Sequence, residues 1–461
     1  MSGSRIFGTD GVRARINTGS MTAENIIRIA LATGQYFLNQ RDKGNTTLRR
    51  RPLVVIGKDT RLSGYMIEAA LQAGFASIGM DTRLIGPLPT PGVANLTRTL
   101  RADLGVMISA SHNPHHDNGI KLFGPDGYKL PDEAEAEISK IVEGHIPLAD
   151  PVDLGRARRM LDGLGRYVET VKSAIPRTMR FEGLKVVVDC ANGAAYRAAP
   201  DVLFELGAEV IPLAVDPDGM NINDGCGAVH PELMADAVVA HGADIGLALD
   251  GDADRLILAD EKGGILDGDH CLAVIADMIA EEKTLAGNAV IGTLMTNHGL
   301  AQYLEGQGIG LERTQVGDRY ILERMRAGGF NLGGEPSGHI LMTDYATSGD
   351  AIMAALKMLS VLKKADKPAS ETLRRFTALP QRIINIKSDD RDHMMTVLSS
   401  ETVQNLINTA ENRLKGTGRV VIRPSGTEPL LRVMVEAEDD AVMNTTCEDI
   451  AEQISARLTS S

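Results

Sequence analysis

Three closely spaced aspartates are the residues of this chain whose types and spacing point most directly to chemistry. Asp250, Asp252 and Asp254 alternate in the stretch Asp250–Arg255, directly after an apolar run. Carboxylates this close repel one another unless a cation compensates their charge. Mg²⁺ and Ca²⁺ prefer oxygen ligands, and Mg²⁺ commonly shares them with phosphates. The spacing therefore predicts a metal site, and Mg²⁺ is favoured if a phosphate takes part.

Two other kinds of metal site fit the sequence less well. An EF-hand loop would place its last ligand at Glu261, but Arg255 occupies the position that requires glycine, and the flanks have strand patterns. His112, His115 and His116 form a cluster that could suggest zinc. The turn at Asn113–Pro114 and the lack of neighbouring cysteines disfavour that interpretation.

A serine loop is the second chemical feature. Ser111 lies in Ser109–Pro114, which follows the apolar run Leu104–Ile108. That run predicts a buried strand, and Asn-Pro predicts that it ends in a turn. Chemistry in α/β folds gathers at the carboxyl ends of strands. Lys121 follows closely enough to return to the same loop. By itself the loop is more typical of a polar turn with an ordinary serine.

Two later loops have the composition of ligand sites. The loop Gly333–His339 could bind sugar hydroxyls through Glu335 and Ser337, with His339 available for proton transfer. A second loop and the strand after it offer two arginines, two hydroxyls and the amides around a glycine to one phosphate. Its residues are Arg423, Ser425, Gly426, Thr427 and Arg432. The stretch Val316–Tyr320 is less specific and offers Arg319 to a ligand.

Alternating strand and helix patterns predict where in the fold these loops lie. Apolar runs at Leu53–Ile56, Leu104–Ile108, Lys185–Val188, Ile245–Leu249 and Ala289–Ile291 predict buried strands of α/β units. From about residue 379 the pattern becomes α+β, with a last helix over roughly 440–457. We predict four domains. They are 1–160 with the serine loop, 161–262 with the metal loop, 263–378 with the sugar loop, and 379–461 with the phosphate loop.

Composition limits the classes of function. The 461 residues carry a net charge of −13, which disfavours nucleic acid and anionic membranes as partners. The four cysteines are scattered, which indicates reduced thiols and a cytoplasmic location. No stretch resembles a signal peptide or a membrane span. A soluble cytoplasmic protein is expected.

Taken together and in order, the four loops resemble the α-D-phosphohexomutase superfamily. The motifs are Ala-Ser-His-Asn-Pro, Asp-Gly-Asp-Ala-Asp-Arg, Gly-Glu-x-Ser-Gly-His and Arg-Pro-Ser-Gly-Thr-Glu-Pro. Phe7–Arg13, Gly57–Met66 and Val316–Tyr320 are most similar to its phosphoglucosamine mutase branch. The resemblance implies an α/β protein of four domains around a central cleft. Three are related α/β domains with mixed sheets, and the C-terminal α+β domain is like the TATA-box-binding protein.

The resemblance also implies roles for single residues. Ser111 matches the serine that is phosphorylated, and its phosphate completes a site for one Mg²⁺ with Asp250, Asp252 and Asp254. Arg13, Lys121 and His339 match residues of proton transfer or charge stabilisation. The implied substrate-binding residues are Arg255, Arg319, Glu335, Ser337, Arg423, Ser425, Gly426, Thr427 and Arg432.

The implied reaction interconverts glucosamine 6-phosphate and glucosamine 1-phosphate through a 1,6-bisphosphate, and supplies UDP-N-acetylglucosamine and cell-wall synthesis. A hexosamine or glucose 1,6-bisphosphate would act as activator. Within the superfamily, phosphoglucomutase or phosphomannomutase is the alternative. A metal-dependent phosphatase with an Asp-x-Asp loop and a non-catalytic sugar-phosphate sensor are the other classes. The expected partner is a small sugar phosphate, without nucleic acid or membrane, and a homodimer is a candidate assembly.

Overall fold

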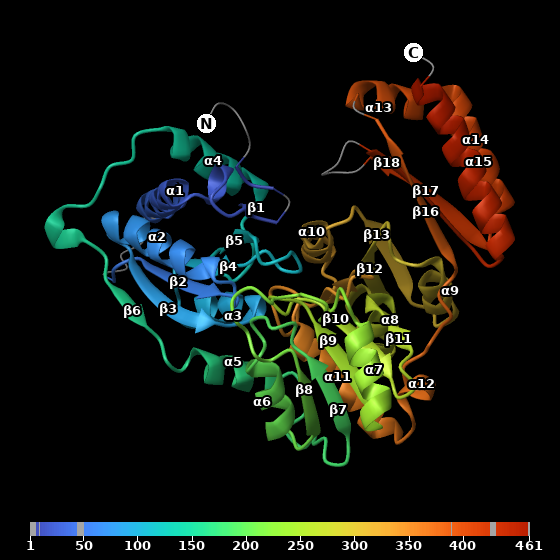
Figure 1. The fold of residues 1–461 in the computed structure, drawn as a ribbon, viewed down its shortest axis with the longest axis horizontal. Coiled ribbons are helices and arrows are strands. Elements are labelled where there is room, and N and C mark those ends of the chain that lie inside the picture. The colour runs from blue at the N-terminus through green and yellow to red at the C-terminus, as the bar shows by residue number, and fades with distance from the viewer. Residues whose placement is uncertain (1–5, 9, 44–49, 389, 425–429, 460–461) are drawn as a thin grey trace. The chain divides into compact units, whose positions relative to one another are not determined.

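The computed structural model describes residues 6–8, 10–43, 50–388, 390–424 and 430–459. The chain divides into two compact units. The first contains residues 1–293 and 314–375, and the second contains 294–313 and 376–461. Figure 1 shows the course of the chain through its helices and strands.

A six-stranded mixed sheet begins the first unit, in the order β1-β5-β4-β2-β3-β6. β2 pairs in parallel with β3 and β4, whereas β5 is antiparallel to both β4 and β1. Its strands are β1 (Val12–Arg15), β2 (Leu53–Lys58), β3 (Asp81–Pro87), β4 (Leu104–Ile108), β5 (Asp117–Phe123) and β6 (Ala157–Arg159). Its helices are η1 (Gly19–Met21), α1 (Ala23–Lys43), α2 (Ser63–Ser77), α3 (Thr90–Thr99), α4 (Asp132–Glu143) and η2 (Pro151–Asp153).

Alternation along β2 explains how this sheet is covered on both faces. Val54 and Ile56 point into a core that also contains Ile26 of α1 and Ile67 of α2. Figure 1 shows α1 and α2 lying along this face. On the opposite face α3 packs so closely that a Cβ at Gly57 would lie 2.4 Å from Val93. Burial on both faces therefore explains the continuous apolar runs of β2 and β4.

The second sheet of this unit has the order β11-β10-β9-β7-β8. β7 pairs in parallel with β8 and β9, and β10 is antiparallel to β9 and β11. Its strands are β7 (Lys185–Asp189), β8 (Glu209–Leu213), β9 (Ile245–Leu249), β10 (Leu256–Asp260) and β11 (Ile265–Leu266). Its helices are α5 (Gly163–Lys172), α6 (Ala198–Glu205) and α7 (Glu232–His241). The turn between the buried strands β9 and β10 carries the three aspartates.

The remaining part of the first unit supplies a short hairpin. β12 (Ala289–Thr293) is parallel to β14 (Leu332–Gly334), which is antiparallel to β15 (Ile340–Met342). The turn between β14 and β15 holds Glu335, Ser337 and His339. The helices here are α8 (Gly268–Glu281), η3 (Ala286–Asn288), α10 (Asp318–Gly328), α11 (Ala351–Ala365) and α12 (Ala369–Thr372).

The second unit contains an antiparallel three-stranded sheet in the order β16-β18-β17. Its strands are β16 (Gln381–Lys387), β17 (Gly418–Pro424) and β18 (Leu430–Ala437), and most of β13 (Gly310–Thr314) falls in the unit's range. Its helices are α9 (His298–Gly306), α13 (Arg391–Ser399), α14 (Glu401–Arg413) and α15 (Asp440–Thr459). Val433 and Val435 of β18 share a buried core with Val403 of α14 and Ile450 of α15.

The observed elements confirm the expected fold class of α/β parts with mixed sheets followed by an α+β part. The predicted strands at 53–56, 104–108, 185–188 and 245–249 are present, and α15 confirms the predicted last helix. The boundaries at residues 160, 262 and 378 stay predictions. Among the described residues, no helix combines the length and apolar character needed to cross a membrane.

Candidate active site

The serine loop follows β4 without a break, as its sequence predicts. Ser111 is 1% exposed, and its φ of +52° lies in the left-handed region that an L-residue rarely adopts. Its amide donates to Ser109 Oγ at 2.9 Å, and Ser109 Oγ donates to Asp59 Oδ2 at 2.6 Å. Ser111 Oγ donates to Asp250 Oδ2 at 2.6 Å. The fold therefore brings the predicted nucleophile directly to the predicted metal loop.

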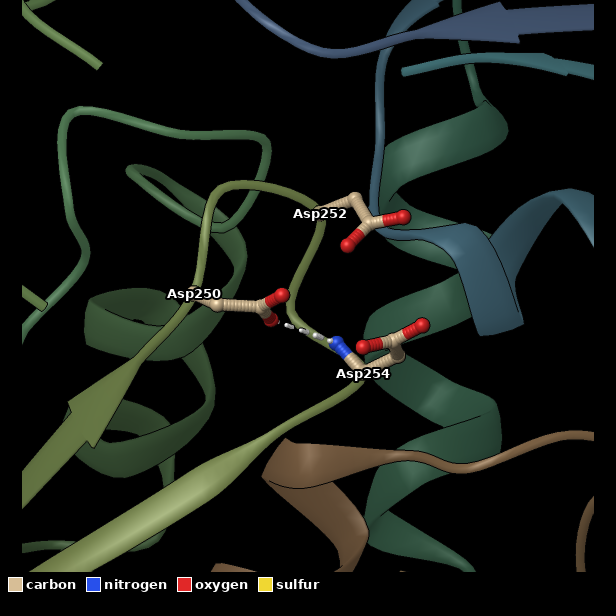
Figure 2. A group of neighbouring side chains, drawn as sticks. All are labelled: Asp250, Asp252 and Asp254. Atoms are coloured by element: carbon tan, nitrogen blue, oxygen red, sulfur yellow. Dashed lines mark hydrogen bonds between the residues drawn. The ribbon is translucent and has the colours of Figure 1, made fainter. Parts of the chain in front are cut away.

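The three aspartates converge as their spacing predicts. Figure 2 shows Asp250, Asp252 and Asp254 around one turn, with the Asp254 amide donating to Asp250 Oδ1 at 3.1 Å. All three are buried, and one oxygen of each lies within 4.8 Å of the others. The strands β9 and β10 flank the turn, which confirms that it is not an EF-hand.

The donor set of this cluster fits a hard divalent cation. Asp252 Oδ1 and Asp254 Oδ1 are buried and accept no hydrogen bond from the described residues. Burial, with the charges of Asp254 and Asp252 added, raises the pKa of Asp250 to about 8. Buried carboxylate oxygens without a donor are costly unless a cation compensates them. Asp250, Asp252 and Asp254 would hold such a cation.

Lys121 is a buried cation beside this cluster. It lies on β5, and its Nζ is 2.7 Å from Asp252 Oδ2 and 3.4 Å from Asp254 Oδ2. Burial alone would lower the pKa of Lys121, but Asp10, Asp252 and Asp254 raise it well above its ordinary value. The same lysine helps to hold the pKa of Asp254 well below its usual range, against the opposite effect of burial. The raised pKa favours the protonated, positively charged ammonium form of Lys121.

His339 lies between two carboxylates. Its Nδ1 is 3.6 Å from Asp254 Oδ1 and its Nε2 is 3.5 Å from Asp318 Oδ2. Burial opposes the charged imidazolium, but Asp254 and Asp318 overcome it and raise the pKa of His339. His339, in the turn of the β14–β15 hairpin, is therefore the second group after Lys121 whose surroundings favour its protonated form.

Asp10 joins three of the cations that surround the serine loop. It pairs with Arg13 on β1, and its Oδ2 lies 3.4 Å from Lys121 Nζ. Its Oδ1 accepts a hydrogen bond from Lys129 Nζ at 2.6 Å, and Lys129 also pairs with Asp318. Burial opposes ionisation of Asp10, but Lys121 and Lys129 lower its pKa well below the usual range. Arg13 is therefore oriented by a partly buried carboxylate.

The predicted sugar-binding residues lie partly at this centre. Ser337 Oγ donates to Glu335 Oε2 at 3.4 Å, and Glu335 Oε1 accepts from the amide of Gly317 at 3.0 Å. Arg255 lies beside the aspartates, with its Nε 3.9 Å from Asp254 Oδ1. Arg319 instead pairs with Asp132 and Glu135 of α4. The structure places that guanidinium against a helix, and its contact with substrate stays a prediction.

The predicted phosphate site belongs to the second unit. Arg423 and Arg432 oppose each other across β17 and β18, and both line a pocket of about 260 Å³ with Asn385 and Met434. Burial and the like charge of Arg432 lower the pKa of Arg423, so an anion would relieve both effects. Ser425, Gly426 and Thr427 lie outside the described residues.

Sequence reasoning missed several polar residues of this centre. Asp59 is buried and accepts from Ser109 of the serine loop. Lys129 and Asp318 are partly buried and pair with each other, and Asp318 also lies beside His339. Asp10 and Asp318 fall inside stretches singled out in the sequence, but their pairing could not be read from spacing. Lys129 follows an ordinary Asp-Gly turn and carries no sequence signal.

Comparison with known proteins agrees with this arrangement. Models of the four phosphoglucomutase/phosphomannomutase domains match the chain. The α/β/α domains I, II and III match residues 4–146, 165–264 and 267–379, and the C-terminal domain matches 383–453. A phosphoglucosamine mutase of Paracoccus denitrificans is 58% identical, covering 97% of this chain and 98% of its own. One from Ruegeria is 53% identical, covering 98% and 99%.

Solved structures share the fold. A phosphoglucomutase/phosphomannomutase family protein of Burkholderia thailandensis has a TM-score of 0.81 at 24% identity, covering 100% of this chain and 99% of its own. An N-acetylphosphoglucosamine mutase of Aspergillus fumigatus, solved with GlcNAc-6P and magnesium, has a TM-score of 0.67 at 18% identity, covering 98% and 96%. The domain matches and the high identity over nearly the whole length show that this chain belongs to the phosphoglucomutase/phosphomannomutase family, within its phosphoglucosamine mutases.

Proposed function

We propose that this protein interconverts glucosamine 6-phosphate and glucosamine 1-phosphate through a phosphorylated Ser111. The observation that carries the proposal is the hydrogen bond of 2.6 Å between Ser111 Oγ and Asp250 of the aspartate cluster. It puts a nucleophilic oxygen at the edge of a cation site and among buried cations. The names of relatives that are 53–58% identical support the amino sugar as substrate.

The reaction is two phosphoryl transfers in opposite directions. In the first, a free sugar hydroxyl attacks the phosphorus of phosphoserine 111 and gives up its proton, the Oγ–P bond breaks, and Ser111 Oγ keeps the electron pair and takes up a proton. The 1,6-bisphosphate then turns around. In the second transfer Ser111 Oγ gives up that proton and attacks the other phosphorus, whose bond to the sugar oxygen breaks, and the sugar oxygen takes up a proton. Catalysis of such transfers depends mainly on positioning and charge stabilisation.

The chain's residues divide these tasks. Arg13, Lys121 and Arg255 supply positive charge around the phosphoryl group, and an arginine stays protonated and cannot act as a base. The raised pKa values of Lys121 and His339 favour their protonated forms, so either can deliver a proton to the serine oxygen as the phosphoryl group leaves. Glu335 and Ser337 would bind sugar hydroxyls in both orientations. Arg423, Ser425, Gly426, Thr427 and Arg432 would hold the phosphate that is not reacting.

One Mg²⁺ completes the proposed enzyme, held by Asp250, Asp252, Asp254 and the phosphate on Ser111. When bound, it would supply positive charge at the phosphoserine. The proposal includes a hexosamine or glucose 1,6-bisphosphate as activator, a cytoplasmic location and a homodimer as the candidate assembly. A phosphoglucomutase or phosphomannomutase would use the same residues on neutral hexoses.

Phosphorus NMR tests the proposal directly. Protein with Mg²⁺, glucosamine 6-phosphate and a trace of hexose 1,6-bisphosphate should form glucosamine 1-phosphate, and Ser111→Ala should abolish the product. Ser139→Ala is the control, because it removes a serine hydroxyl that donates to Glu135 O within α4 rather than to the serine loop or the aspartate cluster. Release of inorganic phosphate alone would contradict the proposal and indicate a phosphatase. Conversion only of glucose or mannose phosphates would keep the mechanism and change the substrate.

A further inference from the structure

The carbonyl groups of the serine loop are held from two sides by buried side-chain donors. Arg61 begins the turn into α2 and is fully buried. Its Nη2 donates to Ser111 O at 2.8 Å and to Asn113 O at 2.9 Å, and its Nη1 donates to Asn113 O at 3.1 Å. Asp59 orients this guanidinium through a bond of 2.9 Å to Nε.

Asn223 approaches the same carbonyls from the part of the chain that carries the second sheet. Its Nδ2 donates to Ser111 O at 2.9 Å and to Asn113 O at 3.1 Å. Both partners are carbonyl oxygens and can only accept, so the amide nitrogen must face them. The residue is 6% exposed, with a φ of +57°. Asparagine tolerates this conformation better than most residues.

The metal loop packs closely against the Ser111 carbonyl group. A Cβ at Gly251 of the metal loop would lie 2.6 Å from Ser111 O and 2.9 Å from Asn223 Nδ2. The metal loop, the Asn223 amide and the Arg61 guanidinium therefore converge on one carbonyl oxygen. That oxygen belongs to the residue whose backbone is held in the left-handed region.

We propose that Asn223, together with Arg61, is a positioning residue that fixes the Ser111 backbone so that Oγ keeps one place through both phosphoryl transfers. The inference rests on the proposed function. The same oxygen must release a phosphoryl group and then take one from the reoriented intermediate. A serine loop free to leave the left-handed conformation would move Oγ away from Asp250. The donors on the Ser111 carbonyl oppose that movement without touching the substrate.

Two variants of Asn223 separate this role from folding. Asn223→Gly keeps the positive φ and removes the amide, and Asn223→Asp keeps the shape but turns an acceptor oxygen toward the two carbonyls. Asn192→Gly is the matched control. Asn192 also has a positive φ, at +49°, but its Nδ2 donates to Asn221 O and not to the serine loop.

The measurements are kcat and KM for glucosamine 6-phosphate, and the phosphate released from the phosphorylated enzyme per product formed. Asn223→Gly removes both hydrogen bonds to the serine loop, and we expect kcat to fall at least about tenfold, with KM changed by less than about threefold. Phosphate released per product should rise, because a misplaced phosphoserine reacts more often with water. Asn223→Asp should lose more, and Asn192→Gly should keep the parent values.

The outcomes separate the inference from the function on which it rests. An active parent enzyme with unchanged kcat in both Asn223 variants would overturn the inference alone. So would an equal loss in Asn192→Gly together with an equal fall in melting temperature, because that would assign Asn223 to folding only. An inactive parent enzyme would instead overturn the proposed function.

Discussion

At the scale of single residues, the centre works by balancing buried charges against one another. Asp252 illustrates this, because its Oδ2 accepts from Thr90 Oγ1 at 2.6 Å and from Lys121 at 2.7 Å, while its Oδ1 accepts no hydrogen bond from any residue that the structure describes. One oxygen is thus committed to the protein, and the other is left for a cation. This division explains why a short run of alternate aspartates can be both a structural turn and a metal site.

We therefore expect Asp252→Asn to raise the Mg²⁺ concentration for half-maximal activity by at least about tenfold, because an amide oxygen carries no charge. A titration of mutase activity against Mg²⁺ measures this. Asp260→Asn is the control, because Asp260 is also buried but pairs with Arg374 outside the cluster. An unchanged magnesium response in Asp252→Asn would contradict the assignment of the metal loop.

At the scale of elements, α5 and α11 are joined by a buried polar contact. Asp350 is the N-cap of α11 and accepts from the amide of Met353 at 2.9 Å. Tyr167 of α5 lies 3.0 Å from both of its oxygens and donates to them. Burial raises the pKa of Asp350 from 3.8 to about 6, although these hydrogen bonds act in the opposite direction.

This contact predicts a pH dependence of stability. Because the folded-state pKa is raised, the folded protein binds more protons than the unfolded chain between about pH 4 and pH 6, so its stability falls as pH rises through that window. The loss from this one group is about 3 kcal/mol, since one pKa unit corresponds to about 1.4 kcal/mol. Asp350→Asn should flatten the dependence, measured as urea unfolding followed by circular dichroism between pH 4 and 8.

Asp366→Asn provides the comparison for that experiment, because Asp366 is an exposed aspartate at the other end of α11. It should leave the dependence of unfolding free energy on pH as it is in the parent protein. If Asp350→Asn also leaves this pH dependence unchanged, the pKa of Asp350 is not raised in the folded protein.

At the scale of the whole molecule, ion pairs connect parts of the first unit that are distant in sequence. Arg319 of α10 pairs with Asp132 and, at 3.0 Å, with Glu135 of α4. The side chains of Arg319 and Glu135 are 11% and 4% exposed, so water screens this pair weakly. The pair ties the helix before the sugar loop to the helix that covers the first sheet.

A double-mutant cycle with Arg319→Met and Glu135→Gln tests this tie. We expect Arg319→Met to lower the free energy of unfolding by about 2–4 kcal/mol, because it removes the cation beside the buried Glu135 carboxylate. Glu135→Gln should lower it by less, because Arg319 keeps its pair with Asp132. The double variant should lose less than the sum, with a coupling of at least about 1 kcal/mol in urea unfolding. The exposed pair Arg166 and Asp162 should show a much smaller coupling, because water and salt screen it. Equal coupling energies in the two pairs would show that burial does not strengthen the Arg319–Glu135 pair.

The sequence predicted those elements whose burial leaves a strong pattern. β2, β4, β7 and β9 are buried on both faces, so their apolar runs could be recognised without a structure. β6 was missed because its three residues are exposed and two of them are arginines. β5 was not predicted as a strand, although only eight residues separate β4 from β5 and so short a connection favours an antiparallel pair.

The sequence by itself determined the chemistry of the site, because Ser111, the three aspartates and the Glu335–His339 loop are local groups whose residue types state what they can bind. Only the tertiary structure decided the environment of each group. By residue type alone Lys121 could serve as a base, but three carboxylates from two distant loops raise its pKa well above the ordinary value. Arg319 and Asn223 found their partners on segments more than a hundred residues away. Charge and hydrogen bonding act over a few ångströms in space, and sequence spacing does not record such distances once the chain has folded.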